Sequence, residues 1–245
     1  MSKEKIIGVC KFCDTEKQLC KAHIVPKSFY TKKLHLNVSQ HSPYAKRLWE
    51  GVYDKNILCC ECDRKFGQYE DYAKKLLFDN LSIYKVPDKA MYFIPNNEFD
   101  YEKFRKFIVF MVWKASISKE DYCKNVDLGP YEQNASAILN NHNNYDRDFG
   151  FAVIKNSNLE LKDIHIPPVP MKFAGVSGYH FIFTGFSIYI IPNYKNFLNK
   201  GTKLNEIFAS ASCGLSIIET DDLEMTGSCH IIRIWDEYLK ISNNQ

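Results

Sequence analysis

Three short stretches near the start of the chain decide the fold: CKFC at residues 10–13, AHIVP at 22–26 and NILCCECDRKF at 56–66. A Cys-x-x-Cys pair on a tight turn directs both of its thiolates toward one point. Two such pairs supply four sulfurs, which is the tetrahedral ligand set of a structural Zn²⁺ site. The alternative is four structural cysteines without a metal. The predicted zinc ligands are Cys10, Cys13, Cys59 and Cys62.

The order of these stretches resembles the HNH (ββα-metal) endonuclease family. In that family a first C-x-x-C pair precedes a histidine followed by Ile, Ile or Val, and Pro. An Asn-Ile or Asn-Leu step then leads into the second C-x-x-C pair. The match covers about the first third of this chain. The resemblance implies two strands and a helix beside a structural zinc ion, and a second, catalytic metal ion.

The resemblance also implies catalytic residues. His23 would be the general base, because a neutral imidazole accepts a proton at cytosolic pH. Asp63 would hold a catalytic Mg²⁺ or Mn²⁺ ion, and Asn56 would fix the loop and orient the histidine. The family often carries an acidic ligand just before the histidine, where this chain has Ala22. For His23 the alternatives are a core histidine or a histidine beside the zinc ion. For Asp63 the alternative is a carboxylate at a helix N-terminus, and for Asn56 it is a turn asparagine.

Other side chains near the motif have weaker claims. Glu70 lies two helical turns beyond Asp63 and could replace the carboxylate that is lost at position 22, although a solvent-facing glutamate is the alternative. His35 and His41 lie in the insertion between the two cysteine pairs, and no spacing links them to a metal. Cys60 adjoins the second pair and is interpreted as a bystander.

Positive charge is concentrated in the part of the chain that carries the cysteines. The chain as a whole has a net charge of +3, but residues 1–47 contain ten Lys and Arg against three Asp and Glu, whereas residues 81–245 contain seventeen against nineteen. Such a bias suits a phosphate-binding face, and a solvated lysine face is the alternative. The predicted nucleic-acid-binding residues are Lys27, Lys32, Lys33, Arg64 and Lys65, with Phe29 and Tyr30 as aromatic neighbours.

Periodicity along the chain indicates an α+β protein. We expect an N-terminal ββα-metal domain over residues 1–80 and a mixed helical and β-rich domain over 81–245, with the nearest approach to a boundary at 85–97. The predicted helices cover residues 63–78, 101–118, 130–141, 207–211 and 230–241. The predicted strands cover 6–13, 21–25, 55–58, 149–154, 161–164, 172–174, 179–183 and 186–191, with a hairpin turn at 184–185.

The sequence favours a cytoplasmic DNA endonuclease, in a context such as phage defence, with RNA as the alternative substrate. No signal peptide is visible and the apolar runs are too short to span a membrane. Unpaired cysteines together with a zinc set indicate a reducing compartment. Two other functions stay open: a zinc-containing nucleic-acid-binding protein without catalysis, which Ala22 favours, and a zinc-scaffolded protein-interaction adaptor. A protein partner or a second copy would then bind the C-terminal domain.

Overall fold

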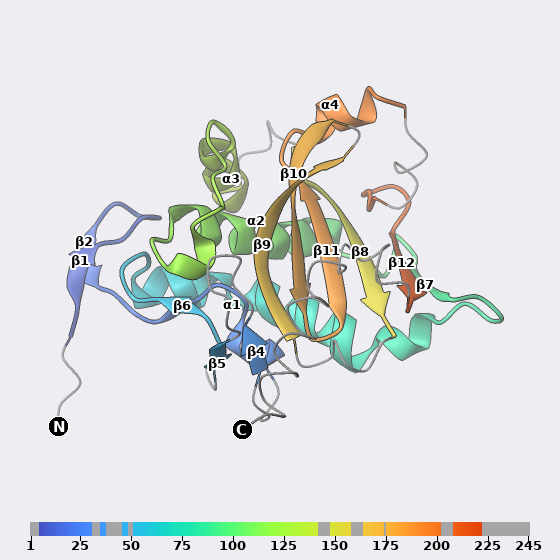
Figure 1. Ribbon diagram of the computed structural model, residues 1–245, viewed down its shortest axis with the longest axis horizontal. Coiled ribbons are helices and arrows are strands. Elements are labelled where there is room, and N and C mark those ends of the chain that lie inside the picture. Colours follow the sequence, from blue (N-terminus) through green and yellow to red (C-terminus); the bar gives the residue numbers. More distant parts are fainter. Residues whose placement is uncertain are drawn as a thin grey trace, which may run out of the picture.

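The computed structural model combines helices and sheets, so the expected α+β class is confirmed (Figure 1). The residues that the structure describes are 5–30, 35–37, 46–48, 51–141, 148–157, 164–173, 175–201 and 208–221. The strands are β1 (Ile7–Val9), β2 (Glu16–Gln18), β3 (Ala22–His23), β4 (His35–Asn37), β5 (Lys46–Leu48), β6 (Tyr53–Asp54), β7 (Met91–Ile94), β8 (Gly150–Asn156), β9 (Ile164–Phe173), β10 (Val176–Phe183), β11 (Phe186–Ile191) and β12 (Leu215–Thr220). The α-helices are α1 (Cys60–Lys74), α2 (Tyr101–Ile117), α3 (Tyr131–Leu139) and α4 (Tyr194–Leu198). The short 3₁₀ turns are η1 (Lys27–Phe29), η3 (Leu81–Tyr84) and η4 (Asp121–Cys123), and η2 (Lys75–Asp79) is a π-helical turn.

One eight-stranded sheet dominates the structure, with the strand order β5-β4-β9-β10-β11-β8-β12-β7. Its neighbouring strands are antiparallel, except that β4 pairs with β9 and β8 with β12 in parallel. The central hairpin β10–β11 turns at Thr184 and Gly185, whose φ angles are 47° and 79°. Two consecutive positive φ values are what a two-residue hairpin turn of type I′ needs. The hairpin predicted from the sequence is therefore confirmed.

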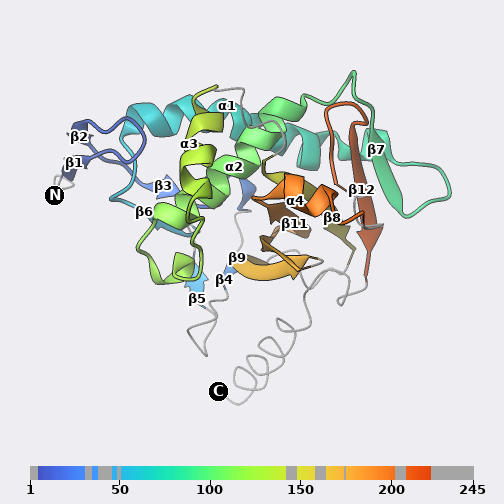
Figure 2. The same ribbon diagram turned by 90° about the horizontal axis from the view of Figure 1, so that it is seen from above.

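Helix α2 is the centre of the helical layer. It runs between α1 and α3, and all three lie on one face of the sheet (Figure 2). Its first turn is capped by Asp100, whose Oδ1 accepts a hydrogen bond from the backbone N of Lys103 at 3.0 Å. Nearly every residue from Phe104 to Ala115 is buried, because helices and sheet surround it on several sides.

The hydrophobic core runs across the boundary expected at residue 80. One cluster of buried side chains extends from Cys10 to Ile217. Within it the Phe29 ring lies 5.4 Å from the ring of Phe107 and 5.3 Å from that of Phe183. The N-terminal part and the sheet therefore share a core, and the independence of residues 1–80 as a folding unit stays a prediction.

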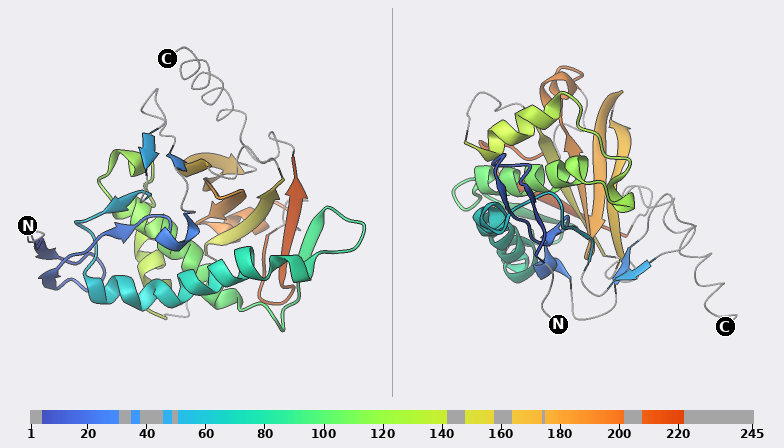
Figure 3. Two further views of the ribbon diagram at one scale, coloured as in Figure 1. Left: turned by 90° about the horizontal axis from the view of Figure 1, so that it is seen from below. Right: turned by 90° about the vertical axis from the view of Figure 1, so that its left-hand side faces the viewer.

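The two small sheets lie near the N-terminus. Strands β1 and β2 form a hairpin at one end of the long axis, with β7 at the other (Figure 3). Strand β3 pairs with β6, and α1 follows β6 after a short turn. The second strand was expected over 55–58, and this prediction is wrong by a few residues. The Asp54 side chain accepts a hydrogen bond from the backbone N of Asn56 at 2.7 Å, which turns the chain before residue 57.

Several other predictions differ from the structure. Helix α1 begins at Cys60 rather than at residue 63, and β2 and β5 lie where irregular chain was expected. Residues 208–211 form turns and an isolated bridge, so a helix there is wrong, and the helix predicted over 230–241 lies outside the described residues. Strands β7 and β12 were missed. They pair with each other, and β7 lies inside the segment 85–97 that was taken as the nearest approach to a boundary.

Candidate metal centre and its surroundings

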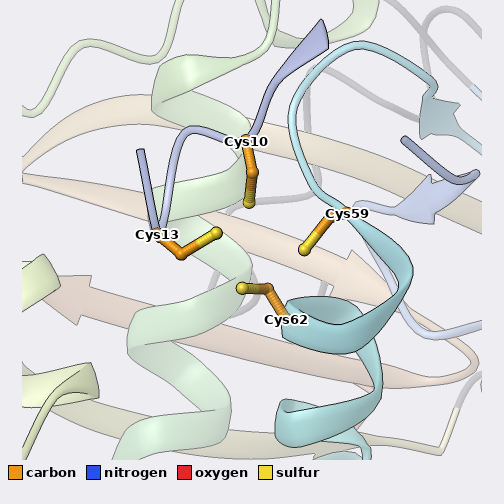
Figure 4. Close-up of side chains that lie close together, drawn as sticks. All are labelled: Cys10, Cys13, Cys59 and Cys62. Atoms are coloured by element: carbon orange, nitrogen blue, oxygen red, sulfur yellow. The ribbon is translucent and has the colours of Figure 1, made fainter. Parts of the chain in front are cut away.

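The four predicted zinc ligands converge in the structure. The Sγ atoms of all four cysteines lie within 4.8 Å of one another. Cys10 and Cys13 come from the turn after β1, whereas Cys59 and Cys62 come from the start of α1, and the four side chains point toward a common centre (Figure 4). Three of them are buried and Cys13 is exposed. Two loops that are distant in sequence therefore present one four-sulfur set.

Backbone hydrogen bonds hold the two loops together. The backbone N of Lys11 donates to the carbonyl of Ile57 at 2.8 Å, and that of Cys20 donates to the carbonyl of Leu58 at 3.0 Å. Within the first loop Asp14 has a φ angle of 52° and its backbone N donates to the carbonyl of Cys10 at 2.9 Å. The tight turn brings the first cysteine pair to one side of the chain, and the bridges between loops set it opposite the second pair.

The thiols of the centre differ in acidity. Burial opposes ionisation of Cys13, but hydrogen bonds from Thr15 and from neighbouring thiols outweigh it and lower the pKa of Cys13 to about 7. Burial raises the pKa of Cys62, and hydrogen bonding to Cys59 raises that pKa further. A bound metal would replace these contacts, because thiol ligands bind as thiolates and release their protons.

This donor set fits a metal ion such as zinc. Four cysteine sulfurs around one point match the closed, tetrahedral coordination of a structural Zn²⁺ site. Cys60 is exposed and lies outside the four-sulfur group. Its thiol is hydrogen-bonded to that of Cys20, whose pKa is raised to about 12 by burial first and by Asp63 and Cys60 next. A cysteine pair that the sequence did not single out thus lies beside the metal centre.

His23 lies on β3, next to this centre. It pairs with Tyr53 across the two-stranded sheet, and the two rings meet edge to face with centroids 5.6 Å apart. The side chain is half-buried. Its backbone carbonyl accepts a hydrogen bond from the ammonium of Lys114, which lies on α2. The strand that carries His23 is therefore fixed to the central helix through a buried cation.

Lys114 is the most unusual side chain in this region. Its side chain is 0% exposed, and its Nζ lies 3.0 Å from Oε1 of Glu70 and 4.0 Å from the centre of the Phe110 ring. Burial raises the pKa of the Glu70 carboxyl and the nearby Lys114 charge opposes that rise. Burial likewise raises the pKa of Asp63, against the effect of Lys114 and of a hydrogen bond to Cys20. The charge of one buried ammonium thus lowers the pKa of two acidic side chains of α1, against the effect of burial.

The surroundings of Lys114 also include the residue that was expected to bind the catalytic ion. Asp63 and Glu70 offer oxygen ligands of the kind that Mg²⁺ prefers. Glu70 already pairs with the Lys114 ammonium at 3.0 Å, and the charge of Lys114 also acts on Asp63. Among the described residues, the four cysteines form the one group of three or more His, Cys, Asp or Glu ligands that is close enough to hold an ion. Mg²⁺ is often held by one or two carboxylates together with water, so an ion at Asp63 stays a prediction.

Asp54 fixes the loop that contains Asn56, for which the HNH resemblance predicted such a role. Its side chain is buried; Oδ1 accepts from the backbone N of Asn56 at 2.7 Å, and Oδ2 accepts from the hydroxyl of Ser118 at 2.8 Å. Asn56 itself is exposed, and its role in orienting His23 stays a prediction. This role of Asp54 was not predicted, because an aspartate before a turn is typical of an ordinary turn former.

The basic residues around the centre are partly those predicted. Lys27, Arg64 and Lys65 are exposed, and the Lys65 ammonium lies 5.0 Å from the centre of the Phe12 ring. Two further lysines flank the aromatic ring beside His23. The ammonium of Lys21 lies 4.6 Å and that of Lys55 5.8 Å from the centre of the Tyr53 ring. Both lysines are exposed.

The aromatic neighbours predicted for this face belong to the interior instead. Phe29 is 2% exposed, and Tyr30 is half-buried and stacks on His165 with centroids 4.1 Å apart. Phe29 is therefore not placed to stack on a base, because the packing of β10 and α2 encloses it. His35 lies in β4. Lys32, Lys33 and His41 lie outside the described residues.

Comparison with models of protein families, with curated proteins and with solved structures finds no match to this chain. The resemblance to the HNH family thus rests on the motif residues alone. Within the part of the chain that the structure describes, no helix combines the length and the apolar character needed to cross a bilayer.

Proposed function

We propose that the chain is a zinc-stabilised protein that binds nucleic acid beside its metal centre and works without a resident catalytic ion. The observation that carries this proposal is the buried Lys114 ammonium, which pairs with Glu70 and donates to the carbonyl of His23. It supplies positive charge in the region where the ββα-metal pattern would use a divalent ion. The departure at Ala22, which removes an acidic ligand, supports the same conclusion.

The nucleic-acid part of the proposal rests on exposed cations around an aromatic ring. Lys21 and Lys55 both lie over Tyr53, which is half-exposed at the edge of the small sheet. Phosphate groups bind lysine ammoniums, and a tyrosine ring offers a surface on which an unpaired base can stack. DNA is the proposed partner and RNA the alternative.

Salt-dependent binding tests this proposal. Fluorescence anisotropy with labelled single-stranded and double-stranded DNA and RNA should give affinities that fall steeply as salt rises. Changing Lys21 and Lys55 together to Ala should weaken binding and reduce the salt slope by about 2, since each lost phosphate contact removes roughly one unit. Lys200→Ala, an exposed lysine beyond α4, is the matched control and should change neither. Binding that ignores salt, or a double variant that binds like the parent, would contradict the proposal.

The second candidate is the metal-dependent endonuclease that the HNH resemblance implies, with phage defence as its context by analogy. It is favoured by the order β3, β6, α1 around the cysteine centre, which sets His23 and Asp63 on neighbouring elements. In this candidate His23 takes a proton from the attacking water. Asp63 would bind a divalent ion, which would be repelled by the nearby charge of Lys114.

A plasmid cleavage assay with Mg²⁺ or Mn²⁺, against an EDTA control, separates the two candidates. We expect binding without cleavage. If the parent protein cuts, the second candidate predicts that His23→Ala lowers the rate by roughly two to four powers of ten, the usual contribution of a general base. It also predicts that Asp63→Ala abolishes cutting and leaves the zinc content unchanged. A protein that neither binds nor cuts would point to the interaction adaptor.

A further inference from the structure

A cavity of about 420 Å³ lies far from the cysteine centre, between the sheet and the turns that follow α1. Leu77 and Phe78 of η2 and Leu81 of η3 form one wall, and the ends of β8, β11 and β12 form the other. In Figure 1 the arrowheads of β8 and β12 point toward these helical turns. The volume falls within the range of roughly 300–1,000 Å³ that is usual for small-molecule sites.

The sheet wall of the cavity changes from apolar to polar within one row of side chains. Phe186 pairs with Lys155, and Lys155 pairs with Glu219 across three neighbouring strands. The Phe186 ring meets Phe78 from the opposite wall edge to face, with centroids 5.4 Å apart. The cavity therefore has an aromatic half and a charged half.

The charged half is a connected network. The Lys155 ammonium donates to the Tyr92 hydroxyl at 2.7 Å and to Oε1 of Glu219 at 2.7 Å, while Lys85 also pairs with Glu219. Burial opposes ionisation of Glu219, but hydrogen bonds from Lys155 and Lys85 outweigh it and lower its pKa to about 2. Two ammonium groups against one carboxylate leave one net positive charge beside the cavity.

We propose that this cavity binds a nucleoside monophosphate or a closely similar flat heteroaromatic anion. Apolar and aromatic side chains on one wall suit the faces of a planar ring. The Lys155 ammonium has three donor positions. Within the part of the chain that the structure describes, its acceptors are Tyr92 and Glu219, which leaves one position for an anionic oxygen. Asn156 and Thr184 also line the cavity, and the Thr184 hydroxyl, which donates to the carbonyl of Phe29 at 2.8 Å, can accept a hydrogen bond from a base or a sugar.

Calorimetric titration of the full, zinc-loaded chain tests the proposal. The probes are adenosine, guanosine, cytidine and uridine monophosphates, with adenosine, inorganic phosphate and benzoate as partial mimics. At least one nucleotide should bind, and each partial mimic should bind more weakly by roughly tenfold or more, because it lacks either the charge-assisted contact or the ring contacts. The assignment would be overturned if benzoate bound as tightly as every nucleotide. It would also be overturned if none of the four nucleotides bound.

Two variants locate the site. Lys155→Met should weaken nucleotide binding by roughly tenfold to a hundredfold, the loss of one charge-assisted hydrogen bond. Ser82→Trp places a bulky ring at an exposed position of the cavity wall without changing any charge, so it should block binding while the protein stays folded. Two control variants should bind the nucleotide like the parent. They are Lys200→Met, away from the cavity, and the double change of Lys21 and Lys55 to Ala. Unchanged binding in both cavity variants would refute the site, whatever the outcome for nucleic acid at the zinc end.

Discussion

Cys62→Ser should remove the metal and unfold the region where α1 begins. The purified parent protein should carry about one zinc ion per chain, because the described residues present one four-sulfur set. Metal binding and folding are linked in such sites, where the ion contributes on the order of 10 kcal/mol. The effect should be large here, since Cys10, Cys59 and Cys62 are buried members of the main hydrophobic cluster.

Elemental analysis of zinc together with thermal unfolding followed by circular dichroism measures this effect. Cys213→Ser is the matched control, because Cys213 is exposed and lies outside the four-sulfur group. It should keep the parent's zinc content and melting temperature. A Cys62→Ser protein that retains both would show that the cysteines are structural residues without a metal.

Lys114→Met should destabilise the fold by about 3–5 kcal/mol, the usual cost of breaking a buried ion pair from one side. Methionine has a similar length and packs well among apolar side chains, so the loss comes from the charge and not from a cavity. Glu70 would lose the ammonium 3.0 Å from its carboxylate, and the carbonyl of His23 would lose its donor. Chemical denaturation at pH 7 measures the change, with Lys124→Met at an exposed position as the control.

The pH dependence and a second substitution identify the cause. Burial already raises the pKa of Glu70, and loss of Lys114 would raise it further. When folding raises the pKa of a group, the free energy of unfolding is largest at pH values below the ordinary pKa of that group. It falls as the pH rises through the pKa of the group in the folded protein. The Lys114→Met protein should therefore be more impaired at pH 7 than at pH 4. Adding Glu70→Gln should restore part of the stability at pH 7, and a double variant no better than the single one would argue against the ion pair.

The parts of the structure that could be predicted are those in which neighbouring residues carry the information. Within each of the segments 10–13 and 59–62 the two cysteines are three positions apart, on a turn and at a helix start respectively, so each pair brings its own two sulfurs together. The apolar face of α2 and the turn at residues 184–185 are equally local. Each of these features is specified by side chains less than about two helical turns apart, so that periodicity and turn chemistry were sufficient.

The parts that were missed depend on contacts between distant residues. Lys114 lies on an apolar helix, where a single lysine reads as a position facing solvent, yet its partner on β3 is 91 residues away in the sequence. Asp54 likewise accepts a hydrogen bond from Ser118 at the end of α2, 64 residues away in the sequence. Strands β7 and β12 are short, and they adopt the strand conformation because β12 pairs with β7 on one side and with β8 on the other. Propensity is a weak guide where tertiary pairing decides the conformation.

The strand order of the large sheet has a consequence for how the chain acquires its structure. Its outer strands β5, β4 and β7 are made early in synthesis, whereas the strands that lie between them all belong to residues 150–220. The early strands thus cannot pair until their partners have been synthesised. Strand β4 pairs with β9 across a sequence separation of more than a hundred residues. Non-local pairing of this kind slows folding and leaves apolar surface exposed in the interval. A nascent chain with a bound metal ion would already have its N-terminal loops joined, and so would begin this search from a partly ordered state.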